Sequence, residues 1–245
     1  MRKQIHINIA AVTLSSVVLA ATMLAANAAP ARKAPSRGVA KAPAKPASRT
    51  PMVPLKLALP KPAYLGTPKN ISGTTAERPT GKPRPAVYVP VGTRNVAQGK
   101  PVSGSDDAPI IGTLDLITDG DKQAVEGSWV ELGPGTQWVQ IDLKQPYALS
   151  YLVMWHFHGE ARVYRDVVVQ VADDADFVKG VRTIFNNDQD NSSGLGLGKD
   201  REFFESAEGK LVNMKGVKAR YVRLYSKGNT SDDQNHYTEV EVYGK

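Results

Sequence analysis

Apolar and polar residues alternate along several stretches in the C-terminal part of the chain. The alternation covers residues 138–143, 166–171, 221–225 and 239–242, and a period of two is typical of a β-strand with one buried face. Residues 149–157 are more continuously apolar, as expected for a strand in the middle of a sandwich. Clusters of Gly, Asp and Asn separate these runs, and we find no helical stripe longer than about ten residues. We therefore predict an all-β sandwich.

The aromatic residues divide the chain into two parts. All three Trp and all five Phe lie in residues 91–245, a stretch of 155 residues, which is a normal size for one domain with its own core. Residues 29–90 contain 13 of the 17 prolines and neither Trp nor Phe. Such a stretch buries too little apolar surface to offset its ordering entropy. We predict a disordered linker over residues 29–90 and one folded domain over residues 91–245.

The first 28 residues have the three parts of an export signal. Two basic residues follow the initial Met, an uncharged Ala/Val/Leu-rich stretch extends to about residue 26, and small residues precede Ala29. This order is typical of a cleaved secretory signal peptide. The alternative is a retained anchor, because the apolar stretch is nearly long enough to span a bilayer. We expect a bacterial protein exported to the periplasm, the cell surface or the medium.

The positive charge lies outside the predicted domain. The net charge is +7, but residues 29–90 carry twelve Lys and Arg against one acid, whereas residues 91–245 carry 17 bases and 23 acids. The basic stretch is either a plain spacer or a tether for anionic polymer of the cell envelope. We expect no nucleic-acid partner for an exported chain. The absence of Cys excludes disulfides, thiolate metal sites and a cysteine nucleophile.

Five motifs of the predicted domain occur in a recognisable order and spacing. They are residues 95–102 (NVAQGKPV), 117–121 (ITDGD), 138–143 (WVQIDL), 219–224 (ARYVRL) and 239–244 (EVEVYG). Together they resemble the discoidin domain, also called the coagulation factor 5/8 type C domain, and the bacterial family 32 carbohydrate-binding modules of the same galactose-binding-like superfamily. The resemblance implies a jelly roll of about eight strands whose loops at one end bind a glycan without catalysis.

The resemblance also implies a structural Ca²⁺ between an Asp-Gly loop and the last strand. The matching positions are Asp119, Asp121 and Glu239, and Ser128 offers a hydroxyl or carbonyl oxygen. Calcium takes six to eight oxygen ligands, which carboxylates and loop carbonyls can supply. On residue chemistry alone, Asp119 could simply begin a turn and Glu239 could be a solvated strand residue.

The ligand site implied by the resemblance follows the strand at residues 149–157. Imidazole, carboxylate and guanidinium groups can bond to sugar hydroxyls, and an aromatic ring can stack on a sugar. His156, His158 and Glu160 are two residues apart, so their side chains project from one face if the strand continues that far. The alternative is that each is an ordinary structural residue. The candidates are His156, His158, Glu160, Arg162 and Tyr164.

Two other readings of the sequence concern catalysis and ligand preference. His156, His158 and Glu160, with His236 as a fourth member, could hold zinc, which is the only arrangement we find that would make an enzyme. Some sialidase-linked members place Trp and His just after the Asp-Gly loop, and residues 129–132 (WVEL) lack that pair. A galactose preference therefore does not transfer. We expect no enzyme activity.

One long loop completes the candidate chemistry. Residues 186–198 are polar and rich in Gly, but they match neither a calcium-binding EF-hand nor a nucleotide-binding loop. We expect this loop to line or cover the binding end. The prediction is a monomeric, exported glycan-binding protein with structural calcium. The alternative is an envelope adhesion or scaffold protein that binds another protein through the same loops.

Overall fold

The computed structural model describes residues 50–64, 73–76 and 79–245. They belong to one compact unit, Ser48–Lys245. The predicted signal peptide and the first part of the predicted linker lie outside the described residues. Within the described ranges no helix has the length and apolar character needed to cross a membrane, and the single helix is the short 3₁₀ helix η1 (Leu114–Thr118).

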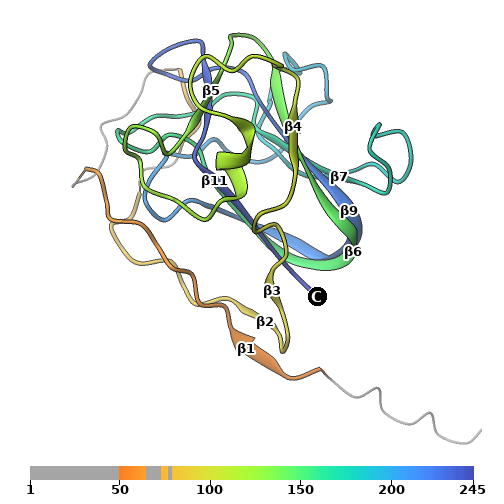
Figure 1. Ribbon diagram of the computed structural model, residues 1–245. Helices are drawn as coiled ribbons and strands as arrows, with labels where there is room; N and C mark the ends of the chain where they lie inside the picture. The colour runs from red at the N-terminus through yellow and green to blue at the C-terminus, as the bar shows by residue number, and fades with distance from the viewer. Residues whose placement is uncertain (1–49, 65–72, 77–78) are drawn as a thin grey trace, which may run out of the picture. The chain divides into compact units, whose positions relative to one another are not determined.

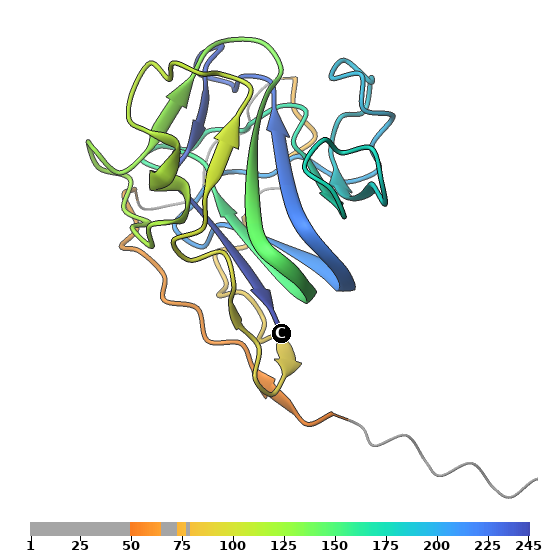
Figure 2. The same cartoon turned by 45° about the vertical axis from the view of Figure 1, so that its right-hand side comes forward.

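Two long antiparallel strands, β6 (Gln137–Trp155) and β9 (Lys210–Ser226), run through the whole domain. Their register shifts twice, once between Asp142 and Tyr147 and once between Leu149 and Tyr151. At the first shift the extra residues are on β6, and at the second they are on β9. Extra residues in one strand bend the pair, so each strand contributes to two different sheets (Figure 2).

The two halves of the β6–β9 pair carry different neighbours. In one half the strand order is β4-β6-β9-β7-β8, and in the other it is β3-β11-β6-β9. A separate two-stranded sheet pairs β5 with β10. The remaining strands are β3 (Arg94–Asn95), β4 (Val102–Gly104), β5 (Val130–Leu132), β7 (Val168–Ala172), β8 (Arg182–Asn186), β10 (Asn235–Tyr237) and β11 (Glu239–Gly244) (Figure 1).

The core lies between these two sheets. Alternate residues of β6, β9 and β11 point inward, as expected from the pleat of a strand, and they are fully buried. The predicted alternation therefore marks real strands, and the prediction of an all-β sandwich is confirmed. The inward residues include Val139, Ile141, Leu152, Met154, Val222, Leu224, Val240 and Val242.

The predicted linker needs correction at residues 50–64 and 79–90, which pack on the domain. Strand β1 (Met52–Pro54) pairs with β2 (Tyr88–Pro90), and Tyr64 donates to the carbonyl of Glu205 at 2.5 Å. These residues pack on the domain because a short apolar run contacts the outer face of the second sheet. The average composition of residues 29–90 does not show this run. The run contributes Leu55 and Leu57, and the sheet contributes Tyr151, Val153, Trp155, Leu211 and Tyr243.

An ion pair lies at the first bend. Arg220 on β9 donates from Nε and Nη2 to the two carboxylate oxygens of Asp142 at 2.8 and 2.9 Å, and the amide of Lys144 donates to Asp142 at 2.8 Å. The backbone of Lys144 is in the left-handed region, with φ 71°. These bonds hold the extra residues of β6 in place. The hydrogen bond from Arg220 is the main reason that the pKa of Asp142 lies far below its usual range.

Replacing Asp142 should cost stability in a pH-dependent way. A carboxyl with a lowered folded-state pKa stabilises the fold above the unfolded pKa, near 4, and loses that contribution as the pH falls further. We expect Asp142→Asn to lower the melting temperature by about 2–4 °C at pH 7. This difference should shrink between about pH 4 and pH 2. Asp107→Asn, at an exposed position, is the control, and an unchanged Asp142→Asn melt at pH 7 would contradict the role of the pair.

Candidate functional site

Residues 160–166 and 227–235 are two loops that lie side by side. The amide of Arg165 donates to the carbonyl of Gly228 at 3.1 Å, and the amide of Lys227 donates to the carbonyl of Arg165 at 2.9 Å. Further along, Thr230 bonds to the backbone of Val163. This exchange of backbone bonds fixes the register of the two loops. It therefore fixes the positions of the polar side chains that they carry.

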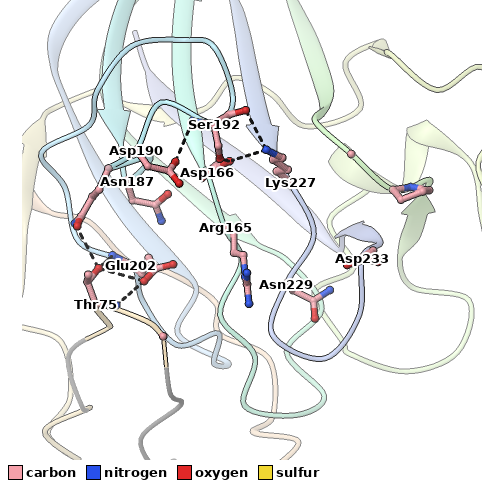
Figure 3. A pocket seen from close by; sticks show the side chains of 14 residues that line it. Thr75, Arg165, Asp166, Asn187, Asp190, Ser192, Glu202, Lys227, Asn229 and Asp233 are labelled. Carbon is pink, nitrogen blue, oxygen red and sulfur yellow. Dashed lines mark hydrogen bonds and ion pairs between the residues drawn. The ribbon is translucent and has the colours of Figure 1, made fainter.

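A pocket of about 570 Å³ opens beside this pair of loops. Segments distant in sequence line it: the two paired loops, the loop predicted to line a binding end together with Glu202, the turn at Pro134 and Gly135, and the N-terminal segment, which comprises the described residues 50–64, 73–76 and 79–90. None of the lining residues within the described part of the chain is aromatic. Its polar lining includes Gln189 and, labelled in Figure 3, Thr75, Arg165, Asp166, Asn187, Asp190, Glu202, Lys227 and Asp233.

Three carboxylates meet at one side of the pocket. Oxygens of Asp166, Asp188 and Asp190 all lie within 4.8 Å of one another. Burial alone would raise the pKa of Asp188, but hydrogen bonds from Ser193 and from the Ser192 amide lower it overall. Asp188 is therefore an ionised anchor for its loop.

Lys227 and Ser192 partly balance this acidic group. Lys227 Nζ lies 3.9 Å from Asp166 Oδ2 and donates to the carbonyl of Ser192 at 3.0 Å. Burial raises the pKa of Asp166, although the Ser192 hydroxyl that bonds to it acts in the opposite direction. Because protein donors already serve these carboxylates, the group is explained by loop structure and we assign no metal to it.

Two donors in the pocket have no protein acceptor in the described part of the chain. The exposed guanidinium of Arg165 forms no hydrogen bond or ion pair there and extends into the middle of the pocket (Figure 3). Asn187 is only 3% exposed; its Oδ1 accepts from Val167, and its Nδ2 lacks a partner. A buried donor without an acceptor is costly. Asn187 Nδ2 is itself buried, so the accessible free donor of the pocket is Arg165, with the exposed carboxylate of Asp233 in the same lining.

Three of the five predicted ligand residues are fully buried: His156, His158 and Tyr164. His156 Nδ1 lies 2.6 Å from a carboxylate oxygen of Glu205, and its ring stacks on Tyr164 at 4.3 Å. His158 Nε2 lies 2.9 Å from the carbonyl of Lys122. As placed, none of the three can touch a ligand. The prediction placed the two histidines on one face, and that face is the inward one: they continue the alternation of the buried Leu152 and Met154 past the end of β6 at Trp155.

A polar layer beneath the paired loops holds these buried side chains. The hydroxyl of Tyr164 lies 2.9 Å from Nδ1 of His236, whose Nε2 lies 3.2 Å from Glu131. Burial lowers the pKa of His236 to about 4 and raises the pKa of Tyr164 well above its usual value. At neutral pH Tyr164 therefore donates to an uncharged His236, which in turn donates to Glu131.

Glu160 and Arg162 are the two predicted ligand residues that reach the surface. Arg162 donates from Nε to Glu160 at 2.6 Å and from Nη1 to Asp232 at 2.8 Å, and its guanidinium lies 4.8 Å from the ring centre of Phe157. Its side chain is 13% exposed. Arg162 therefore holds the paired loops together, and Arg165, three residues later, is the free cation. No motif distinguished Arg165, because its position matched the start of a strand.

The histidines do not form the alternative zinc site. His156, His158 and His236 each have a different protein partner, as described above, and Glu160 is paired with Arg162. Within the described ranges, the one cluster of three metal-ligating side chains is the aspartate group of the pocket.

The four predicted calcium positions separate into two groups. Gly120 donates its amide to Oε2 of the fully buried Glu239 at 3.2 Å, which brings the Asp119 loop against β11. Burial raises the pKa of Glu239 to about 9, and its Oε1 has no hydrogen-bond partner. Asp121 instead accepts from Ser128 at 2.8 Å. A buried carboxylate oxygen without a donor fits a cation ligand, so Asp119 and Glu239 suit calcium better than the other two positions do.

Comparisons with known proteins find similar folds but no close relative. No protein-family model matches the sequence, and no curated protein matches it. Similar solved structures include the CBM32 of AlyQ in complex with 4,5-unsaturated mannuronic acid, at 18% identity and a TM-score of 0.43, covering 58% of this chain and 92% of that one.

Two further solved structures are of the same kind. Chitosan-binding module 1 of a chitosanase/glucanase from Paenibacillus sp. IK-5 is 18% identical, with a TM-score of 0.42 over 62% of this chain and 99% of that one. The Streptococcus pneumoniae fucose binding module SpX-3 is 19% identical, with a TM-score of 0.43 over 62% and 98%. All three are carbohydrate-binding modules, the class of domain that the sequence motifs resemble. A likeness at these values assigns no ligand or site to this chain.

Removing His156 should separate a structural role from ligand contact. Because His156 and Glu205 are both fully buried, His156→Ala leaves a buried carboxylate without its partner, and we expect the free energy of unfolding in urea to fall by about 3–5 kcal/mol. Lys218→Ala on β9, which leaves that pair in place, is the control. Unchanged stability in His156→Ala would contradict the structural assignment.

Proposed function

We propose that this domain binds a saccharide in the pocket beside the paired loops, without catalysing a reaction. The observations that support the proposal are the exposed guanidinium of Arg165, which has no protein acceptor in the described part of the chain, and the exposed carboxylate of Asp233 in the same pocket. Sugar hydroxyls both donate and accept, so a few convergent polar groups of both kinds suit them. Export of the chain, predicted from its first 28 residues, belongs to the same proposal.

The charge of the lining narrows the class of saccharide. Among the described lining residues, two are cations, Arg165 and Lys227, and four carry carboxylates: Asp166, Asp190, Glu202 and Asp233. The lining is therefore negative overall, which disfavours a uronate and favours a neutral or amino sugar. Because the described lining contains no aromatic ring, recognition depends on hydrogen bonds and charge more than on stacking.

A charge series of saccharides tests this proposal. Calorimetric titration of the full-length protein should give the highest affinity for the tetrasaccharide of glucosamine, an intermediate affinity for that of N-acetylglucosamine, and the lowest for that of galacturonate. Added salt should reduce the difference in affinity between the glucosamine and N-acetylglucosamine tetrasaccharides, because it screens exposed charges. Arg165→Gln should weaken N-acetylglucosamine tetrasaccharide binding by about tenfold, the loss expected for a bond from a charged donor.

A second arginine supplies the matched control. Arg94 is also exposed, but it lies on β3 with its guanidinium 5.9 Å from the ring centre of Tyr147, so Arg94→Gln should bind as the wild type does. No binding of any saccharide by the folded protein would overturn the proposal. It would favour the alternative, an adhesion or scaffold domain that binds another protein through these loops.

We further propose that a structural Ca²⁺ joins the Asp119 loop to β11. The buried and unpartnered Oε1 of Glu239 supports this assignment, and Asp119 with backbone carbonyls of its loop supplies further oxygens of the kind that calcium takes. The ion would neutralise a carboxylate that burial otherwise disfavours. Its role would be to fix the loop to the last strand, at a distance from the saccharide chemistry.

Calcium should therefore stabilise the protein through Glu239. At a hundredfold excess over its Kd, a ligand that binds only the folded state adds about 2.7 kcal/mol, so the melting temperature should rise from chelator to millimolar Ca²⁺. Glu239→Gln should abolish this rise. Asp190→Asn, in the acidic group of the pocket, should retain it. Equal melting temperatures of the wild type with chelator and with Ca²⁺ would contradict the site.

A further inference from the structure

The N-terminal segment reaches the saccharide pocket at Thr75. The amide of Thr75 donates to Oε2 of Glu202 at 2.5 Å, and its hydroxyl lies 3.2 Å from the same oxygen. Gln189 Nε2 lies 3.4 Å from the Thr75 hydroxyl. Thr75 thus contacts both Glu202, with which it is labelled in Figure 3, and Gln189. Gly73, Thr75 and both partners line the pocket.

The same segment is attached to the domain on both flanks of these residues. Before them, Tyr64 donates to the carbonyl of Glu205. After them, Arg84 donates to the carbonyl of Glu208 at 2.9 Å, and the β1–β2 pair follows. Both attachment points on the domain are within a few residues of Glu202. The stretch that contains Thr75 is therefore attached to the domain at both ends independently of the Thr75 bonds.

We propose that residues 73–76 form a wall of the saccharide pocket and that Thr75 is the positioning residue that holds this wall on Glu202. The inference rests on the proposed function. A bond from an amide to a carboxylate is stronger than one between neutral groups, so the Thr75–Glu202 contact can hold this stretch on the domain. It also satisfies a carboxylate oxygen that would otherwise add a free acceptor to the pocket.

The wall extends the binding site beyond the predicted domain boundary. Residues 91–245 contain the paired loops and Glu202 but lack Gly73 and Thr75. A fragment that begins at residue 91 therefore has a pocket that is open on one side. The N-terminal segment contributes to the affinity of the site in addition to its packing on the sheet.

The test combines saccharide affinity with hydrogen exchange in the full-length protein. The probes are the N-acetylglucosamine and glucosamine tetrasaccharides, and the variants are Thr75→Val and Glu202→Ala. We expect both probes to slow exchange at residues 73–76. The affinity should fall by about threefold in Thr75→Val, which keeps the amide, and by about tenfold in Glu202→Ala, which loses the acceptor. Both variants should speed exchange at residues 73–76 in the free protein.

Two controls match these variants in chemistry. Thr80→Val removes a hydroxyl in the same segment but outside the pocket lining, and Glu126→Ala removes an exposed carboxylate elsewhere. Both should bind the probes as the wild type does. Equal melting temperatures of variants and wild type show that the compared proteins are equally folded.

The outcomes separate the wall from the proposed function. If both variants bind the probes with wild-type affinity, the wall is overturned and saccharide binding stands. A second outcome is that only Glu202→Ala weakens binding and that the probes leave hydrogen exchange at residues 73–76 unchanged. In that case Glu202 contacts the saccharide directly, and the wall is again overturned. If neither probe nor any other saccharide binds, the proposed function is overturned and the wall with it.

Discussion

The bend in the β6–β9 pair determines where everything else in the domain can lie. Without the extra residues near Asp142, one long antiparallel pair would lie in a single sheet, and no second layer could cover its apolar face. The bend lets the same two strands bury residues from both of their halves against each other. The Asp142–Arg220 ion pair and the left-handed Lys144 are local features, yet the sandwich closes around the geometry that they hold.

The sequence pattern predicted the strands well and the way they bend poorly. Alternation marked β6, β7, β9 and β11, because each has one face against the core. It could not show that β6 extends across its own register shift, since residues 144–146 interrupt the pattern there. Nor could composition show that Leu55 and Leu57 meet a second apolar surface around Trp155. That contact joins residues about a hundred positions apart, and a local window does not detect it.

The candidate site was predicted less well than the fold, for a physical reason. The spacing of His156, His158 and Glu160 fits one face of a strand, but for the two histidines that face is the inward one, shared with Leu152 and Met154. The sequence alone does not show whether a histidine or a glutamate binds a ligand or pairs with another residue of the protein. The partners that decide between these roles, Glu205 and Lys122, come from other parts of the chain.

The irregular segment around Glu205 connects the buried layer, the pocket and the N-terminal segment. Three glutamates at intervals of three residues make the connection: Glu202 accepts from Thr75, Glu205 pairs with His156, and Glu208 accepts from Arg84 through its carbonyl. Glu205 makes two contacts: its carboxylate pairs with His156 in the interior, and its backbone carbonyl accepts a hydrogen bond from Tyr64. Burying a polar His–Glu contact costs desolvation, so the contact is by itself weak evidence for stability. Here it fixes the backbone to which both flanks of the N-terminal segment attach. The buried histidine therefore affects the pocket through the position of this segment and not through contact with a ligand.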